Sequence, residues 1–166
     1  MKNDIMIYFD ITTSVRTAED LDQLASEIDS LLVSVFKTQE KSFDNALEEI
    51  SISTSKKIKE AFKKNALDIE NKEIARNFLE RLKDLFGKFK TIGLTLAIEP
   101  SHEMTEHIHN WVSEILGEGY ILKIESDKSL LGGATVVSPS GQYRDFTVKK
   151  SLEKVFSERK EIVQLS

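Results

Sequence analysis

A change of hydrophobic period near residue 90 is the feature that most constrains the fold of this 166-residue chain. Before that point, apolar residues recur at spacings of three and four, as on one face of an α-helix. After it, residues 91–100 alternate between apolar and polar, as in a half-buried β-strand. The sequence therefore predicts an α+β protein in two parts. Residues 1–90 should form an antiparallel helical bundle, and residues 91–166 a small α/β module with a mixed sheet.

Four segments of the first part have the pattern of amphipathic helices, and four to six helices fit the bundle. Thr17 and Asp20 form a capping-box pattern before the first segment, and Asn71 is a candidate N-cap of the last. Shorter segments lie between them, after Ser42 and around residues 56–62. Residues 1–10 form a β-branched and aromatic run that fits either a short strand or an ordered tail.

The second part alternates strands and helices. Residues 91–100 should form a strand, followed by a helix capped by Ser101, strands at residues 120–125, 133–138 and 142–146, and a last helix from Thr147. The crossover helix should make the first two strands parallel, and the later strands should be linked by hairpins. The inward faces of the two helices are predicted to be Met104, Ile108, Trp111, Val112 and Ile115, and then Val148, Leu152, Val155 and Phe156.

The three histidines lie close together, at positions 102, 107 and 109, as in a zinc-binding helix. Their spacing misses both H-E-x-x-H and H-x-x-E-H by one residue. His102, Glu106 and His109 share one face of the expected helix, so adventitious metal binding is an open alternative. The simpler interpretation is a polar outer face opposite Trp111.

Other signs of chemistry are weak. No phosphate-binding glycine string and no nucleophile elbow occurs, so we expect a non-catalytic protein with no cofactor and no metal. The densest basic run, Lys56 to Lys64, has apolar residues at helical spacing and indicates a solvated helix face rather than a nucleic-acid site. A net charge of −5 also argues against nucleic-acid binding. Cysteine is absent, which suits a reducing cytosol. No apolar run is long enough to insert into a membrane.

The loop at residues 126–133 is the densest in turn-forming residues. Leu130 and Leu131 are expected in a loop only if their side chains pack into a hydrophobic core. Gly132 and Gly133 suit a backbone that bends sharply. Asp127 and Ser129 can fix the turn by bonding neighbouring amides. We interpret the segment as a stiff structural corner rather than a catalytic loop.

The same loop carries a family resemblance. Residues 125–133, E-S-D-K-S-L-L-G-G, resemble the D-x-S-L-I-G-G signature of the δ subunit of F-type ATP synthases, the family that includes mitochondrial OSCP. The resemblance covers residues 90–157 and continues where the family carries D-x-S-[VL]-x-x-x-L. The residues that carry this signature are Asp127, Ser129, Leu130, Leu131, Gly132, Gly133, Asp145 and Thr147. The N-terminal part departs from the family, whose members open with an R-Y-A-x-A-L-like helix and a six-helix domain.

The resemblance implies a stator subunit in the peripheral stalk, with no chemistry of its own. The helical part would grip the N-terminal helices of ATP synthase α subunits, and the α/β module would meet the C-terminal end of the b subunit. Together they would resist rotor torque during proton-driven ATP synthesis. The protein would sit peripherally on the cytoplasmic face of the plasma membrane as part of the synthase.

We expect a groove for a partner helix between the first and last long helices of the bundle, because their apolar stripes are the longest. The residues assigned to this groove are Leu24, Ile28, Val35, Phe78 and Leu82. Alternatives that stay open are a peripheral-stalk E subunit of a V- or A-type ATPase, a free-standing adaptor that binds a partner helix, a nucleic-acid-associated module, and a metal- or phosphate-dependent enzyme.

Overall fold

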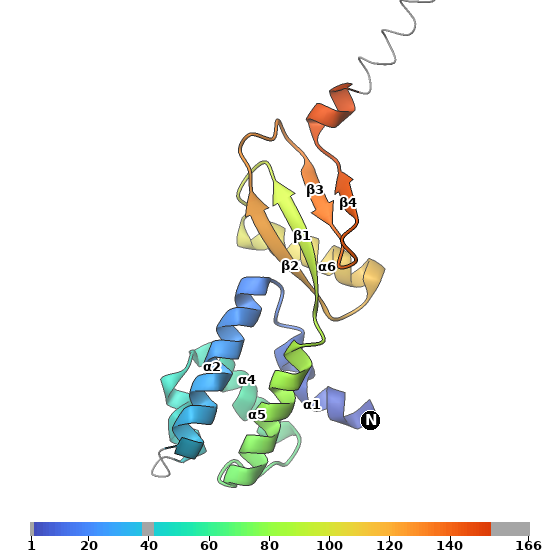
Figure 1. Ribbon diagram of the computed structural model, residues 1–166. Helices are drawn as coiled ribbons and strands as arrows, with labels where there is room; N and C mark the ends of the chain where they lie inside the picture. The colour runs from blue at the N-terminus through green and yellow to red at the C-terminus, as the bar shows by residue number, and fades with distance from the viewer. Residues whose placement is uncertain (1, 38–41, 154–166) are drawn as a thin grey trace, which may run out of the picture. The chain divides into compact units, whose positions relative to one another are not determined.

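The protein consists of a helical unit and an α/β unit. The computed structural model describes residues 2–37 and 42–153, and these divide between Met1–Phe89 and Lys90–Ser166 (Figure 1). Helices make up the first unit, and a four-stranded mixed sheet with helices makes up the second. The predicted α+β fold class is therefore confirmed.

The helical unit contains five α-helices and one 3-10 turn among its described residues. Their bounds are α1 Lys2–Thr12, α2 Ala18–Lys37, α3 Phe43–Ala46, η1 Leu47–Glu49, α4 Ile52–Lys64 and α5 Lys72–Phe86. The predicted caps are confirmed: the Asn71 side chain accepts hydrogen bonds from the first turn of α5, and Asp20 and Thr17 bond each other's backbone amides. The long helices α2 and α5 pack together and run in opposite directions (Figure 1).

The start of the chain is a helix, so the expectation of a strand or tail at residues 1–10 was wrong. Tyr8, Ile11 and Val15 follow each other at spacings of three and four, and all three side chains are buried. The β-branched and aromatic composition of the run hid this period. α1 packs against α4 and belongs to the core.

Aromatic rings connect four helices in this core. The ring of Phe78 in α5 lies 4.9 Å from that of Tyr8 in α1 and 4.9 Å from that of Phe62 in α4, centroid to centroid. Phe62 in turn lies 5.5 Å from Phe43 in α3. Tilted ring pairs at this separation add to the stabilisation from apolar burial. The rings therefore join helices that are far apart in the sequence.

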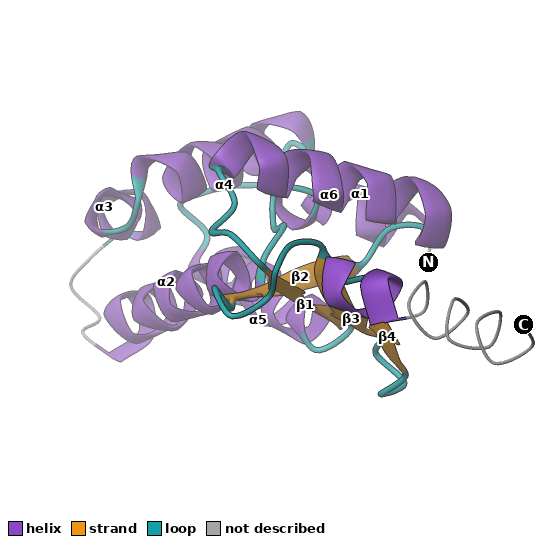
Figure 2. Ribbon diagram, turned by 90° about the horizontal axis from the view of Figure 1, so that it is seen from above, coloured by secondary structure: helices purple, strands orange, loops and turns teal. Residues whose placement is uncertain are grey.

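The α/β unit has strand order β2-β1-β3-β4. Its elements are β1 Lys90–Leu96, α6 His102–Leu116, β2 Tyr120–Ser126, β3 Ala134–Val137 and β4 Tyr143–Asp145, and residues 148–153 are helical. The predicted parallel pairing of the first two strands is confirmed, with Ile92 opposite Leu122. α6 lies over one face of the sheet (Figure 2), where Ile92, Leu94 and Leu122 bury against Val112.

The connection between β2 and β3 differs from the expected hairpin. β3 pairs antiparallel with β1, on the side away from β2, and only β3 and β4 form a hairpin. The amide of Asp127, just after β2, donates to the carbonyl of Leu96 at the end of β1 (2.8 Å). Because of this bond, the loop between β2 and β3 passes over the end of β1 and does not form a tight turn.

The two helices of this unit bury less than expected. In α6 the buried side chains are His109 and Val112, whereas Met104, Trp111 and Ile115 are exposed. The apolar residues of α6 span a wider arc than one contact with the sheet covers. In the last helix, Val148 and Leu152 are also exposed, and the predicted inward residues Val155 and Phe156 lie outside the described residues.

Candidate functional site

The sequence signature folds into one corner of the α/β unit. We call residues 127–133 together with residues 145–148 the glycine corner. Its first half is a side-chain-fixed turn: the Asp127 carboxylate accepts a hydrogen bond from the amide of Ser129 (2.8 Å), and the amide of Leu130 donates to the carbonyl of Asp127 (3.1 Å). These local bonds set the direction in which the chain leaves β2.

The two glycines of the corner lie against the second segment. The amide of Val148 donates to the carbonyl of Gly132 (3.0 Å), and the amide of Phe146 donates to the carbonyl of Ala134 (2.8 Å). Both glycines have left-handed backbones, with φ of +137° at Gly132 and +83° at Gly133. Side chains rarely adopt such values, so glycine suits both positions for conformational reasons.

Asp145 and Thr147 lock the second segment. The Asp145 carboxylate accepts hydrogen bonds from the amide of Thr147 (2.9 Å) and from its hydroxyl (2.7 Å). These bonds hold the pKa of Asp145 below its usual range, with a smaller contribution from the nearby Lys150 and Lys149. Thr147 is itself buried and accepts from the amide of Lys150, so it begins the helix at residues 148–153.

The leucines of the signature do not plug a core as expected. Leu130 is half-buried, and Leu131 is 72% exposed. The chain follows the Asp127 turn and points Leu131 toward solvent. The polar residues of the turn and the two glycines explain the geometry of the corner, and Leu130 and Leu131 are not needed for it.

The residues assigned to a partner groove are core residues. Leu24, Ile28, Val35, Phe78 and Leu82 are all buried within the helical unit. The long stripes of α2 and α5 pack on each other and on the aromatic rings, so they leave no open groove at these positions. The groove assignment is therefore corrected to core packing.

The histidines also separate in the structure. His102 and His107 are exposed, whereas His109 is buried and its Nε2 donates a hydrogen bond to the carbonyl of Tyr120 (3.1 Å). His109 thus lies inward and Trp111 outward, the reverse of the predicted orientation. Within residues 2–37 and 42–153, no group of three or more His, Asp or Glu side chains is arranged to hold a metal ion.

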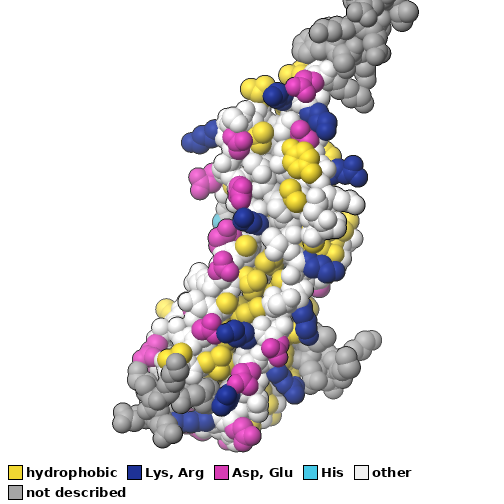
Figure 3. Space-filling view, in the orientation of Figure 1, with side chains coloured by type: hydrophobic (Ala, Val, Ile, Leu, Met, Phe, Trp, Pro, Cys, Tyr) yellow, Lys and Arg dark blue, Asp and Glu magenta, His cyan; other side chains and the backbone are white. Residues whose placement is uncertain are grey.

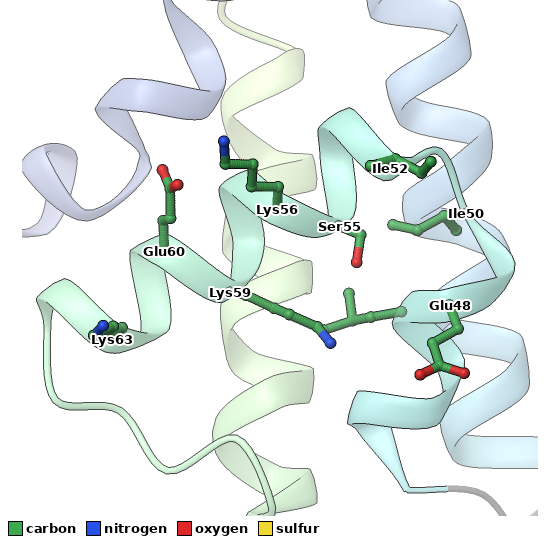
Figure 4. A pocket seen from close by; sticks show the side chains of 9 residues that line it. Glu48, Ile50, Ile52, Ser55, Lys56, Lys59, Glu60 and Lys63 are labelled. Carbon is green, nitrogen blue, oxygen red and sulfur yellow. The ribbon is translucent and has the colours of Figure 1, made fainter.

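The basic run borders a hollow that the sequence did not reveal. Figure 4 shows it between α4 and the turn that carries Glu48 and Ile50. It has a volume of about 560 Å³, and its lining is Leu47, Glu48, Ile50, Ile52, Ser55, Lys56, Lys59, Glu60 and Lys63.

Two lysines of the basic run have acidic partners, and one of them, Lys59, lines the hollow. Lys59 forms an ion pair with Asp44 (2.7 Å), and Lys64 pairs with Asp10 of α1. The bond to Asp10 raises the pKa of Lys64. A wide hollow with an apolar floor and charges of both signs at its edge identifies no particular ligand.

The sheet has a second face that α6 leaves uncovered. Register places Val137 and Tyr143 on it, opposite the buried Ile92 and Leu94 side, and both are exposed. In Figure 3, hydrophobic side chains surface there in small groups over the strands. No helix of the described part of the chain is both long enough and apolar enough to span a bilayer.

Comparison with known proteins adds little. No protein-family model matches the chain, and no curated protein matches it in sequence. One solved structure that it resembles is a chain of the Polytomella F-ATP synthase in its primary rotary state 3. The two share 17% sequence identity with a TM-score of 0.40, over 48% of this chain and 100% of that chain. A similarity of this size is too low to assign a function.

Proposed function

We propose that the chain is a non-catalytic stator subunit of an F-type ATP synthase, of the δ or OSCP type. In this role the helical unit binds the N-terminal helices of α subunits, and the α/β unit binds the C-terminal end of the b subunit. The subunit then ties the catalytic head to the stalk and resists rotor torque. It works without a cofactor, at the cytoplasmic face of the plasma membrane and peripheral to it.

The geometry of the glycine corner is the observation that supports this proposal most. The signature comes from two stretches of sequence, and the structure brings them into direct contact: Gly132 accepts from Val148, while Asp145 holds Thr147. Each polar or glycine position of the signature has a structural task there. The residues on which the resemblance rests therefore act together in one folded corner of this chain.

Purification of a tagged copy from its host tests the proposal. We expect the α, β and b subunits of the ATP synthase to co-purify with it. Membranes of a strain that lacks the gene should still hydrolyse ATP, but washing should remove this activity from them. The same membranes should no longer synthesise ATP. Membranes that make ATP normally without the protein would contradict the stator role.

A free-standing adaptor is the second candidate, because α6 exposes an apolar stripe that suits a partner helix. Co-purification with a helical protein unrelated to the synthase would favour it. A V- or A-type E subunit is less favoured. Such proteins usually begin with a long charged coiled-coil helix, and the longest helix in the described residues is α2, with 20 residues.

A further inference from the structure

The outer face of α6 exposes large apolar side chains that the described residues leave uncovered. Trp111 is 61% exposed and Ile115 is 60% exposed, and Met104 and Leu116 are exposed beside them. Single exposed apolar residues are ordinary, but several on one helix face mark an interaction surface. We call Met104, Ile108, Trp111 and Ile115 the α6 stripe.

The spacing of the α6 stripe indicates what shape of partner fits it. Its members follow each other at four, three and four residues, which is the seam of a heptad repeat. Ile108 is half-buried against the sheet core and anchors the stripe to it. A seam of this kind packs against a second helix lying nearly parallel or antiparallel to it.

Charge indicates the chemistry of that second helix. α6 contains no Lys and no Arg. Glu103 and Glu114 are exposed along the edge of the stripe that faces away from the sheet. These two carboxylates favour a partner helix with basic flanks and disfavour a second copy of the same helix.

We propose that the α6 stripe binds an amphipathic α-helix whose apolar seam is flanked by lysine and arginine. The proposal deepens the proposed function, since it assigns the stalk-binding surface of the α/β unit. It rests on that function for the identity of the helix, although the surface itself is defined by α6 alone.

Trp111 provides a direct signal for the test, because it is the only tryptophan in the chain. The probe is a designed tryptophan-free heptad peptide with leucine at its seam and lysine at the flanks. The matched control peptide carries glutamate at the same flanks. Full-length protein is titrated with each, and the fluorescence of Trp111 is followed. We expect saturable binding of the lysine peptide with a blue shift, weakened by salt, and little binding of the glutamate peptide.

Two serine variants locate the binding surface. Ile115→Ser removes a member of the stripe, and Ile98→Ser removes an equally exposed isoleucine (61%) outside it. Both positions are at the surface, so circular dichroism should show both variants folded. Ile115→Ser should weaken lysine-peptide binding about tenfold or more, and Ile98→Ser should leave it unchanged.

Three results would overturn the proposal. These are equal binding of the two peptides, equal effects of the two serine variants, and a dimer of the free protein that Ile115→Ser dissociates. The last result would make the stripe an interface between copies of this chain.

A peptide from the C-terminal end of the host b subunit separates this inference from the stator role. If the lysine peptide binds through Ile115 and the b peptide does not bind, the surface stands and its assignment to the stalk fails. If the b peptide binds wild type and Ile115→Ser equally well, the stator role stands and the α6 surface is overturned.

Discussion

Gly133 lies directly against the backbone of Phe146: a Cβ at residue 133 would be 2.3 Å from the Phe146 carbonyl oxygen and 2.9 Å from the Thr147 Cα. The neighbouring backbone has little room to move away, because the Phe146 amide is bonded to Ala134 and the Val148 amide to Gly132. The left-handed φ of +83° adds a second reason for glycine. Close approach and backbone conformation thus act together at one position.

Gly133→Ala should therefore destabilise the α/β unit strongly. We expect its free energy of unfolding to fall by about 3 kcal/mol or more, because strain and a backbone clash combine. Gly141→Ala is the matched control, since Gly141 also has a left-handed φ (+81°) but open space around its Cβ position. That change should cost about 1 kcal/mol. Denaturant unfolding followed by Trp111 fluorescence measures both, and equal losses would contradict the clash.

Thr147→Val should raise the pKa of Asp145 toward its ordinary value of 3.8. The substitution removes the hydroxyl that donates to the carboxylate and keeps the amide bond, so we expect a partial return. Thr147→Ser should keep the low pKa. Asp127 is an internal control, because its own lowered pKa comes from Ser129 and should stay the same. NMR titration of the carboxyl groups measures all of these.

The sign of the accompanying stability change follows from linkage. The pKa of Asp145 is lower in the folded protein, so its stabilising effect is complete above pH 3.8 and disappears as the pH falls through the lowered value. The stability gap between wild type and Thr147→Val should therefore narrow below pH 3.8. A gap that stays constant from neutral to acid pH would show that the carboxylate bond does not contribute.

Local signals in the sequence were sufficient for most elements. Caps such as Asn71 and Ser101 act within one turn of their own helix, so the residue types alone locate the helix starts. The parallel pairing of β1 and β2 follows from the helix between them. Residues 127–133 of the glycine corner could also be identified, since turn chemistry is local. Asp145 and Thr147 were assigned to the signature only through the family resemblance.

Two features could not be predicted because tertiary packing determines them: the surroundings of Phe78 and the orientation of α6. Whether Phe78 lines a groove or fills a core depends on Tyr8, in a helix whose period was concealed by its composition. The face of α6 that meets the sheet carries Val112 and also His109, which donates to the carbonyl of Tyr120 in β2. Both Phe78 and His109 have their partners in other helices or strands, so the pattern of their own helix does not contain the answer.

Phe78→Ala should unfold the helical unit or come close to it. Its ring contacts those of Tyr8 and Phe62, and removal of a buried phenylalanine costs about 3–5 kcal/mol. Phe9→Ala is the control, because Phe9 is exposed and neighbours Tyr8, and it should change stability by about 0.5 kcal/mol or less. Far-UV circular dichroism during denaturation measures both. A small loss from Phe78→Ala would show that its ring contacts contribute little to the stability of the helical unit.

His109→Ala should destabilise the α/β unit by about 1–3 kcal/mol, since it leaves a cavity and the Tyr120 carbonyl without its donor. His107→Ala, on the exposed side of the same helix, should have little effect. Unfolding followed by Trp111 fluorescence separates the two. If both changes cost the same, the hydrogen bond of His109 has no net stabilising role.

Separation of the chain between residues 89 and 90 should give two fragments that each fold. The α/β unit has its own buried cluster around Ile92, Leu94, Val112 and Leu122, and the helical unit has its own chain of aromatic rings. We expect fragments 1–89 and 90–166 to show cooperative thermal transitions and dispersed NMR spectra. A control division between residues 66 and 67 separates α4 from α5, and with them the contact between Phe62 and Phe78, so fragment 1–66 should be unfolded. Unfolded fragments from the first division would mean that each unit depends on the other for its stability.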